Sequence, residues 1–407
     1  MKEGIDIHNY KRRIVKNEEL IKKATISEKN KQLIFDFRDH CNVEGLSLAR
    51  IDRYMQVLRD WAKHIGTDFD KATIAEITQA VRIVQEKDFS PWTKVTYKSM
   101  LKSFYRWLKK TGEDYSEEVK WIKARMKKSE MKLPGEGQLI SEEEVRRLIE
   151  NASHPRDKAF ISVLYESGTR IGELASLQIM NVKKDKYGML ILVTGKTGSR
   201  PIRIISSAPY LSSWINMHPN RNVEEAPLWI NLSTNYYGSQ INYQGIRQML
   251  KKLFKNAGIN KRFNPHIFRH SRATFLANYL TEFQMNHYFG WTQGSDMAST
   301  YVHMSNKKID ESMLMLNGIE IKKEISDSVL KPKICPLCST VNCADAKFCT
   351  GCGSVMDLKT SYDLESRNTE MRKNSDELLN VLFKDKEVLQ IVMKKINELG
   401  LQDKVIV

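Results

Sequence analysis

The sequence of 407 residues has no apolar run that approaches the roughly 20 residues needed to span a bilayer. Its first residues carry charges of both signs and lack the apolar core of a secretory signal peptide. Acidic residues are too few to balance basic ones, 49 against 65, so the formal charge is +16. We therefore expect a cytoplasmic protein that does not enter a membrane and binds a polyanion, although basic cytoplasmic proteins without such a partner also exist.

Cysteine is scarce outside one short segment. Five of the six cysteines lie between residues 335 and 352, and the sixth, Cys41, lies alone in an N-terminal helical pattern. A disulfide framework would spread its bridges through the fold, whereas this clustering indicates a metal site in a reducing compartment.

Four of the clustered cysteines form two Cys-x-x-Cys pairs. The pairs are Cys335 with Cys338 and Cys349 with Cys352, with ten residues between them. This spacing is typical of a zinc ribbon, and four thiolates leave no open position for a substrate, so we expect structural Zn²⁺. Cys343, between the pairs, is either a spare thiol or an alternative ligand.

Changes in periodicity divide the chain into five parts. Residues 17–128 are helical throughout, and residues 129–140 lose the apolar pattern and contain proline and glycine, which predicts an interdomain linker. A second domain follows over 141–318, then the zinc ribbon over 333–356 and an amphipathic helix over 375–400 that needs either the protein body or a second copy as its partner. No internal repeat is visible.

Capping residues mark several helices. Ser27 and Ser47 precede apolar residues at helical spacing, and Ser141 begins a capping box with Glu144. Another helix begins at Ser90 and Pro91, and its lysines and arginines alternate with aromatic residues. This helix suits contact with DNA phosphates, with a solvated charged face as the alternative.

The second domain alternates helices with a short β-rich stretch. Two β-like runs, 189–194 and 203–205, are joined by a segment with Gly195 and Gly198, which predicts a hairpin with Lys196 near its tip. Helices resume from about residue 243.

Five short motifs follow one another through this domain. They are Gly168-Thr-Arg170 with Glu173 and Leu174 behind it, the hairpin Lys196, His266-Ile-Phe-Arg269-His270, Gly290-Trp291, and Tyr301. In this order they resemble the tyrosine recombinases, also called phage integrases, and particularly the archaeal-type members. The resemblance covers residues 140–315, with a weaker helical match before them.

The resemblance implies a mainly α fold with a small antiparallel β-sheet. A helical, SAM-like core-binding domain and the catalytic domain would close as a clamp around double-stranded DNA, with four protomers assembled on two recombination sites. The chemistry would need no ATP, metal or other cofactor, and no small-molecule substrate is implied.

The residue types fit phosphodiester exchange. Tyr301 would attack the scissile phosphate, forming a 3′-phosphotyrosine bond and releasing a 5′-hydroxyl. Arg170 and Arg269 would hold the non-bridging oxygens, because a guanidinium offers paired donors.

Proton transfer falls to other groups. Lys196 is the candidate acid for the departing 5′-oxygen, and His266 is the candidate to help deprotonate Tyr301. Trp291, where relatives more often have histidine, can donate one hydrogen bond and pack against the tyrosine but cannot carry a proton. His270 is assigned to support of the helix or to a second layer of contacts.

The implied biological role is integration or excision of a mobile element, with inversion or dimer resolution as alternatives. A type IB topoisomerase would use the same nucleophile without a partner site. A DNA-binding regulator with the same fold would not need a tyrosine nucleophile.

Overall fold

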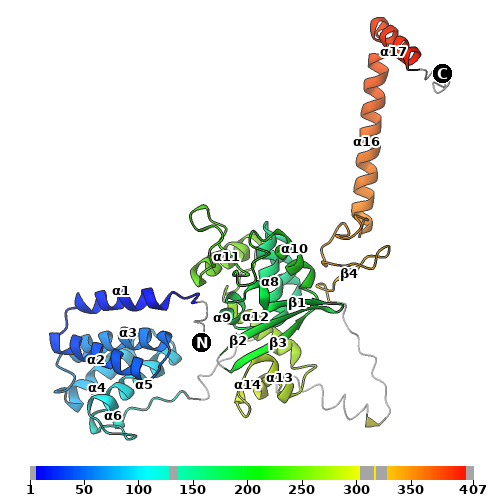
Figure 1. Ribbon diagram of the computed structural model, residues 1–407. Coiled ribbons are helices and arrows are strands. Elements are labelled where there is room, and N and C mark those ends of the chain that lie inside the picture. The colour runs from blue at the N-terminus through cyan, green and yellow to red at the C-terminus, as the bar shows by residue number, and fades with distance from the viewer. Residues whose placement is uncertain (1–5, 128–135, 196, 303–315, 318–327, 400–407) are drawn as a thin grey trace.

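The computed structural model describes residues 6–127, 136–195, 197–302, 316–317 and 328–399. Over these residues the chain is mainly helical, with one three-stranded and one two-stranded antiparallel sheet, which confirms the predicted fold class at that level. Figure 1 shows a helical part beside a larger part that contains the three strands, and one long helix standing out from both. Among the described residues no helix is long and apolar enough to cross a membrane.

The N-terminal part is a bundle of helices around an aromatic core. Its helices are α1 (Tyr10–Lys22), α2 (Glu28–Val43), α3 (Leu48–Ile65), α4 (Ile74–Glu86), α5 (Pro91–Leu108) and α6 (Glu117–Lys120). Ser27 and Ser90 accept hydrogen bonds from backbone amides of their first turns, as predicted, whereas Ser47 begins α3 without one. The first helix begins before residue 17, and Ile7 ahead of it is buried in the core of the larger part.

The larger part is built around one buried helix. Its α-helices are α7 (Glu142–Glu150), α8 (Pro155–Ser167), α9 (Ile171–Ala175), α10 (Ala208–Met217), α11 (Tyr243–Asn256), α12 (Pro265–Leu276), α13 (Glu282–Phe289) and α14 (Asp296–Val302). Helix α8 is buried along nearly its whole length and is covered by α7, α10 and α12. This packing sets the position of the loop that follows the C-terminal end of α8.

The three-stranded sheet carries the predicted hairpin. Strands β1 (Val182–Asp185), β2 (Gly188–Gly195) and β3 (Gly198–Ile204) are antiparallel in the order β1-β2-β3. Gly195 pairs with Gly198, which closes the hairpin where the sequence predicts a tight connection. Strand β1 was not predicted, because its Lys183, Lys184 and Asp185 are exposed and give it no apolar alternation.

The C-terminal part begins with two short strands, β4 (Lys333–Ile334) and β5 (Val341–Asn342), and ends in two helices. These are α16 (Leu358–Leu382) and α17 (Lys386–Glu398), so the single helix predicted over 375–400 is wrong in both its start and its continuity. The break occurs because the Asp385 carboxylate accepts hydrogen bonds from the amides of Glu387 and Val388 and thereby caps a new helix. Figure 1 shows α16 projecting away from the rest of the molecule.

Candidate active site and cysteine cluster

Arg170 lies where the buried helix α8 ends and the short helix α9 begins. Helix α8 is followed by Gly168, whose φ of 57° suits glycine, and a Cβ there would lie 2.7 Å from the Phe289 ring. Arg170 is the N-cap residue of α9. Its guanidinium donates hydrogen bonds to the Glu173 carboxylate at 2.9 Å and to the Gly290 carbonyl at 3.2 Å. Its side chain remains 36% exposed and can therefore reach a ligand.

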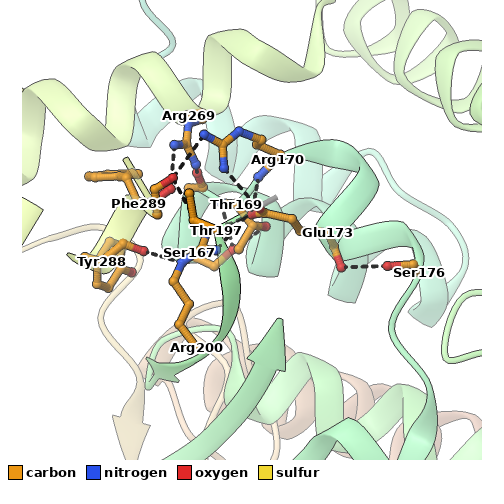
Figure 2. A network of polar contacts seen from close by, with 12 residues as sticks. Ser167, Thr169, Arg170, Glu173, Ser176, Thr197, Arg200, Arg269, Tyr288 and Phe289 are labelled. Carbon is orange, nitrogen blue, oxygen red and sulfur yellow. Dashed lines mark hydrogen bonds and ion pairs between the residues drawn. The ribbon is translucent and has the colours of Figure 1, made fainter. Parts of the chain in front are cut away.

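Glu173 is a buried carboxylate that holds two arginines. Its side chain is 4% exposed, and Arg200 donates to its two oxygens at 2.7 and 3.3 Å. Burial by itself would raise the pKa of Glu173, but hydrogen bonds and charge from Arg200 and Arg170 outweigh it, so the pKa is lowered and the group is ionised. Arg200 also donates to the Tyr288 carbonyl at 2.8 Å. The guanidinium of this buried arginine is therefore occupied by contacts within the protein (Figure 2).

Arg269 extends from α12 into the same site. Its guanidinium donates to the carbonyls of Gly168 at 3.0 Å and Phe289 at 2.7 Å, and it lies over the Trp291 ring, 5.3 Å from the centroid. Burial first, and then the charge of Arg170, lower the pKa of Arg269 to about 9. Figure 2 shows the two side chains, Arg170 and Arg269, next to one another. Two cations held this close favour a bound anion, because an anion would offset their repulsion.

Tyr301 is packed into the site from α14. Its side chain is 3% exposed, and its ring is parallel to that of Trp291, with centroids 5.6 Å apart. Its hydroxyl contacts Nδ1 of His270. Burial raises the pKa of Tyr301 to about 12, even though the charge of Arg269 opposes the shift. In this state the phenol is protonated at neutral pH.

Of the remaining two predicted residues, only His266 lies among the described residues. His266, in the first turn of α12, has an exposed side chain, and partial burial followed by the charges of Arg269 and Arg170 lowers its pKa. Lys196 lies outside the described residues. Its neighbour Thr197 donates from its hydroxyl to the Gly290 carbonyl at 3.4 Å, so the hairpin end is next to the arginine cluster.

Residues 138–308 match the model of the phage integrase family. Tyrosine recombinase XerC of Corynebacterium glutamicum is 24% identical over 290 residues, which cover 69% of this chain and 90% of the relative. These similarities support a tyrosine site-specific recombinase.

Solved structures show that the recombinase shares its fold with DNA-bound members. The XerH site-specific recombinase bound to a palindromic difH substrate, in a post-cleavage complex, matches with a TM-score of 0.53. It is 15% identical, over 78% of this chain and 98% of that one. A lambda integrase tetramer bound to a Holliday junction matches with a TM-score of 0.51 at 13% identity, over 65% of this chain and 78% of that one.

Two contacts in the recombinase site were not predicted from the sequence, one made by Arg200 and one made by His270. Arg200 pairs with Glu173 inside the site, and the signal for it is that it lies opposite Val193 in the hairpin, where side chains of this register face inward. His270 contacts Tyr301 although its place in the motif suggested only a supporting role. Its spacing of one turn from His266 places both histidines on one face of α12.

The recombinase gathers four of its cysteines into one cluster. The Sγ atoms of Cys335, Cys338, Cys349 and Cys352 all lie within 4.8 Å of one another, which is close enough for a shared metal ion. The amide of Gly351 donates to the Cys349 sulfur at 3.3 Å. Backbone hydrogen bonds, with that from Cys352 the largest, lower the pKa of Cys349 to about 6. The thiolate form that binds metals is therefore favoured.

Cys343 lies outside this cluster and faces the body of the recombinase. It packs against the core of the larger part, and burial raises the pKa of its thiol to about 12. The thiol is therefore protonated at neutral pH, which does not favour metal binding. Nearby Asp345 accepts a hydrogen bond from the Tyr210 hydroxyl at 2.6 Å and pairs with Lys158 at 3.3 Å. The segment that contains the cysteines is thus docked on α8 and α10.

Proposed function

We propose that the recombinase cuts and rejoins DNA strands at the site formed by Arg170, Arg269 and Tyr301. One observation carries this proposal: the guanidiniums of Arg170 and Arg269 lie together beside a buried tyrosine, and the carboxylate of Glu173 is shared between Arg170 and Arg200. A phosphodiester supplies the anion that such a pair favours, and the tyrosine supplies the nucleophile. Losing one guanidinium would cost about 3 to 4 kcal/mol of transition-state stabilisation.

The bond changes balance without an external energy source. The Tyr301 oxygen bonds to phosphorus, the bond from phosphorus to the 5′-oxygen breaks, and that oxygen leaves as a hydroxyl after accepting a proton. We assign this proton to Lys196. Attack by a 5′-hydroxyl from another strand reverses the step on a new partner and regenerates the tyrosine.

The other side chains prepare the nucleophile. His266 is the proposed proton acceptor for Tyr301, and its lowered pKa leaves it neutral and able to accept at neutral pH. Trp291 stacks on the tyrosine ring and is the proposed donor of a hydrogen bond to phosphate. We propose no cofactor for this chemistry.

The proposed substrate is double-stranded DNA with specific recombination sites, bound by four protomers. The net charge of +16 supports a nucleic-acid partner, and the lambda integrase relative is a tetramer on a Holliday junction. Residues 17–128 would be the core-binding half of the clamp and residues 141–318 the catalytic half. The proposed role is integration or excision of a mobile element in the cytoplasm, and the archaeal-type affiliation stays a prediction.

We further propose that the four-cysteine cluster over residues 333–356 is a zinc ribbon. Four sulfur donors within 4.8 Å fit a tetrahedral tetrathiolate site for Zn²⁺. The ion would hold the segment folded without taking part in strand cleavage. Gly351 supports the geometry, since a Cβ there would collide with the Thr340 hydroxyl at 2.5 Å.

A nicked suicide substrate tests the chemistry. When a duplex from the presumed attachment site is nicked close to the scissile phosphate, the freed fragment diffuses away and the covalent complex accumulates. We expect wild-type protein, in the presence of a chelator in the reaction buffer, to form an adduct that withstands denaturing electrophoresis. Tyr301→Phe should bind the same DNA and form none.

Three other results would assign a different function. DNA binding confirmed by footprinting, without an adduct from wild type, would indicate a regulator that does not cut. Relaxation of supercoiled DNA without joining of two sites would indicate a type IB topoisomerase. An adduct that persists in Tyr301→Phe would place the nucleophile elsewhere.

A further inference from the structure

Helices α16 and α17 form an arm that has apolar surface but no partner within the described residues. Helix α16 buries only Thr360, and α17 buries no residue. Figure 1 shows α16 leaving the body beside the cysteine segment and α17 at its far end. No described residue of the protein body is therefore the partner of the apolar stripe.

The exposed apolar area is large enough for a stable interface. Nine large hydrophobic side chains of the outer half of the arm are each 40–66% exposed: Leu378, Leu379, Val381, Leu382, Phe383, Leu389, Ile391, Met393 and Leu399. Together they expose on the order of 700 Å², close to the ~800 Å² that each partner buries in an interface of standard size.

The pattern along α16 is that of a coiled-coil helix. Leu364, Met371 and Leu378 are seven residues apart, and Leu382 follows at the next position of the same seam. Met371 is 68% exposed and Leu378 is 61% exposed. A strict seven-residue spacing is the one that keeps a seam facing another helix over several turns.

The polar residues in the seam indicate that the partner helix is α16 of a second copy. Asn368 and Ser375 interrupt the seam, and in a parallel, in-register pair Asn368 meets Asn368 of a second copy, where the two amides can hydrogen bond. In an apolar groove the same side chain would be buried without a partner.

The charge of the arm favours a second copy over DNA. Residues 358–399 contain eight lysines and arginines and eight aspartates and glutamates, so their net charge is 8 − 8 = 0. The whole excess of +16 therefore lies outside the arm, which has no net electrostatic preference for DNA and no net charge to repel a copy of itself. Arg367 and Arg372 flank the seam and would repel each other across a parallel pair, so stabilisation comes mainly from the half beyond Leu378.

We propose that α16 and α17 are a self-association arm, through which two copies of this chain pair in parallel along the seam from Leu364 to Leu382, with the apolar stripe of α17 extending the contact. This contact exists without DNA and goes beyond the proposed assembly on recombination sites. It can therefore fail while the cleavage chemistry stands.

Sedimentation velocity of the full chain without DNA tests the arm. We expect wild type to sediment as a dimer at micromolar concentration and Leu378→Glu to associate roughly 100-fold more weakly, because the seam would bury a carboxylate. Asn380→Glu is the matched control, since it adds the same charge two residues away on the polar side, and it should behave as wild type. Circular dichroism checks that all three keep the same helix content.

Cysteine cross-linking tests the pairing itself. Asn368→Cys should form an interchain disulfide under mild oxidation in zinc-containing buffer, whereas Thr369→Cys, on the next face of the helix, should not. A wild type that is monomeric at micromolar concentration would overturn the proposal and point to a different protein as the partner. A dimer that Leu378→Glu leaves intact would overturn it as well, because the contact would then lie outside the seam.

Discussion

The imidazole of His270 contacts the hydroxyl of Tyr301, while His266, one turn earlier on the same helix, has an exposed side chain. The tyrosine is also covered by Trp291, whose ring is parallel to its own. In the DNA-free protein the nucleophile is therefore buried and protonated. Binding of DNA must bring a phosphate next to the hydroxyl before attack can occur.

The first prediction concerns the titration of Tyr301 in the free protein. Burial raises its pKa to about 12, so it should stay protonated between pH 10 and 11, where an unperturbed tyrosine loses its proton. NMR with tyrosine labelled at Cζ measures this directly, and Tyr301→Phe assigns the signal by its absence. A midpoint near pH 10 would contradict the buried arrangement.

The second prediction separates His270 from other histidines. We expect His270→Gln to slow adduct formation on the suicide substrate by about 10²-fold, because the contact with the phenol is lost, and to leave DNA affinity unchanged. His287→Gln, an exposed position on α13, is the control. Burial and the charges of His266 and Arg269 lower the pKa of His270, so the wild-type rate should persist below pH 6.5 and fall only when the imidazole becomes protonated. A wild-type rate for His270→Gln would limit this histidine to structural support.

Local sequence signals predict the helices and the hairpin well because each depends on nearby residues. The Ser141 capping box and the Gly195–Gly198 closure are both present. Contacts across the fold are different. The pair between Arg200 and Glu173 joins a residue of the hairpin to a residue of α9, and the sequence around neither residue predicts the contact. The same limit applies around Tyr301, since helical spacing places His266 and His270 on one face of α12 but does not say which of them contacts the tyrosine.

The third prediction concerns the buried pair of Glu173 and Arg200. Glu173→Gln should lower the free energy of unfolding by about 3 to 5 kcal/mol, because the buried guanidinium loses its counter-charge. Glu143→Gln is the control, since Glu143 pairs with Arg146 at the surface with 52% of its side chain exposed. Urea denaturation at pH 7 measures both variants.

The pH dependence of this effect follows from the lowered pKa of Glu173. A carboxyl with a lowered pKa in the folded state contributes stability above its unfolded pKa, near 4.3, and loses it as pH falls through the folded value. The difference between wild type and Glu173→Gln should therefore be largest near neutral pH and shrink below pH 4. A difference that does not change with pH would show that the charge of Glu173 is not what stabilises the site.

The fourth prediction tests Lys196 as the proton donor. Arg200 is held by Glu173 and by the Tyr288 carbonyl, so it is not available for this role. Lys196→Ala should cleave a normal suicide substrate about 10²-fold or more slowly. A substrate with sulfur at the bridging 5′-position should restore cleavage, because a thiolate leaves without a proton. Lys184→Ala, an exposed lysine of β1, should match wild type on both substrates, and a Lys196→Ala defect that sulfur does not relieve would exclude the acid role.

The fifth prediction uses the cysteine that the cluster excludes. We expect one zinc ion per chain by elemental analysis, and Cys349→Ser should lose it because three thiolates remain. Cys343→Ser should keep it, since that thiol packs against the core of the larger part instead. Because Asp345 joins the cysteine segment to Tyr210, metal loss should also free this contact and increase amide exchange at the end of α10 in Cys349→Ser. Zinc retained by Cys349→Ser but lost from Cys343→Ser would reverse the ligand assignment.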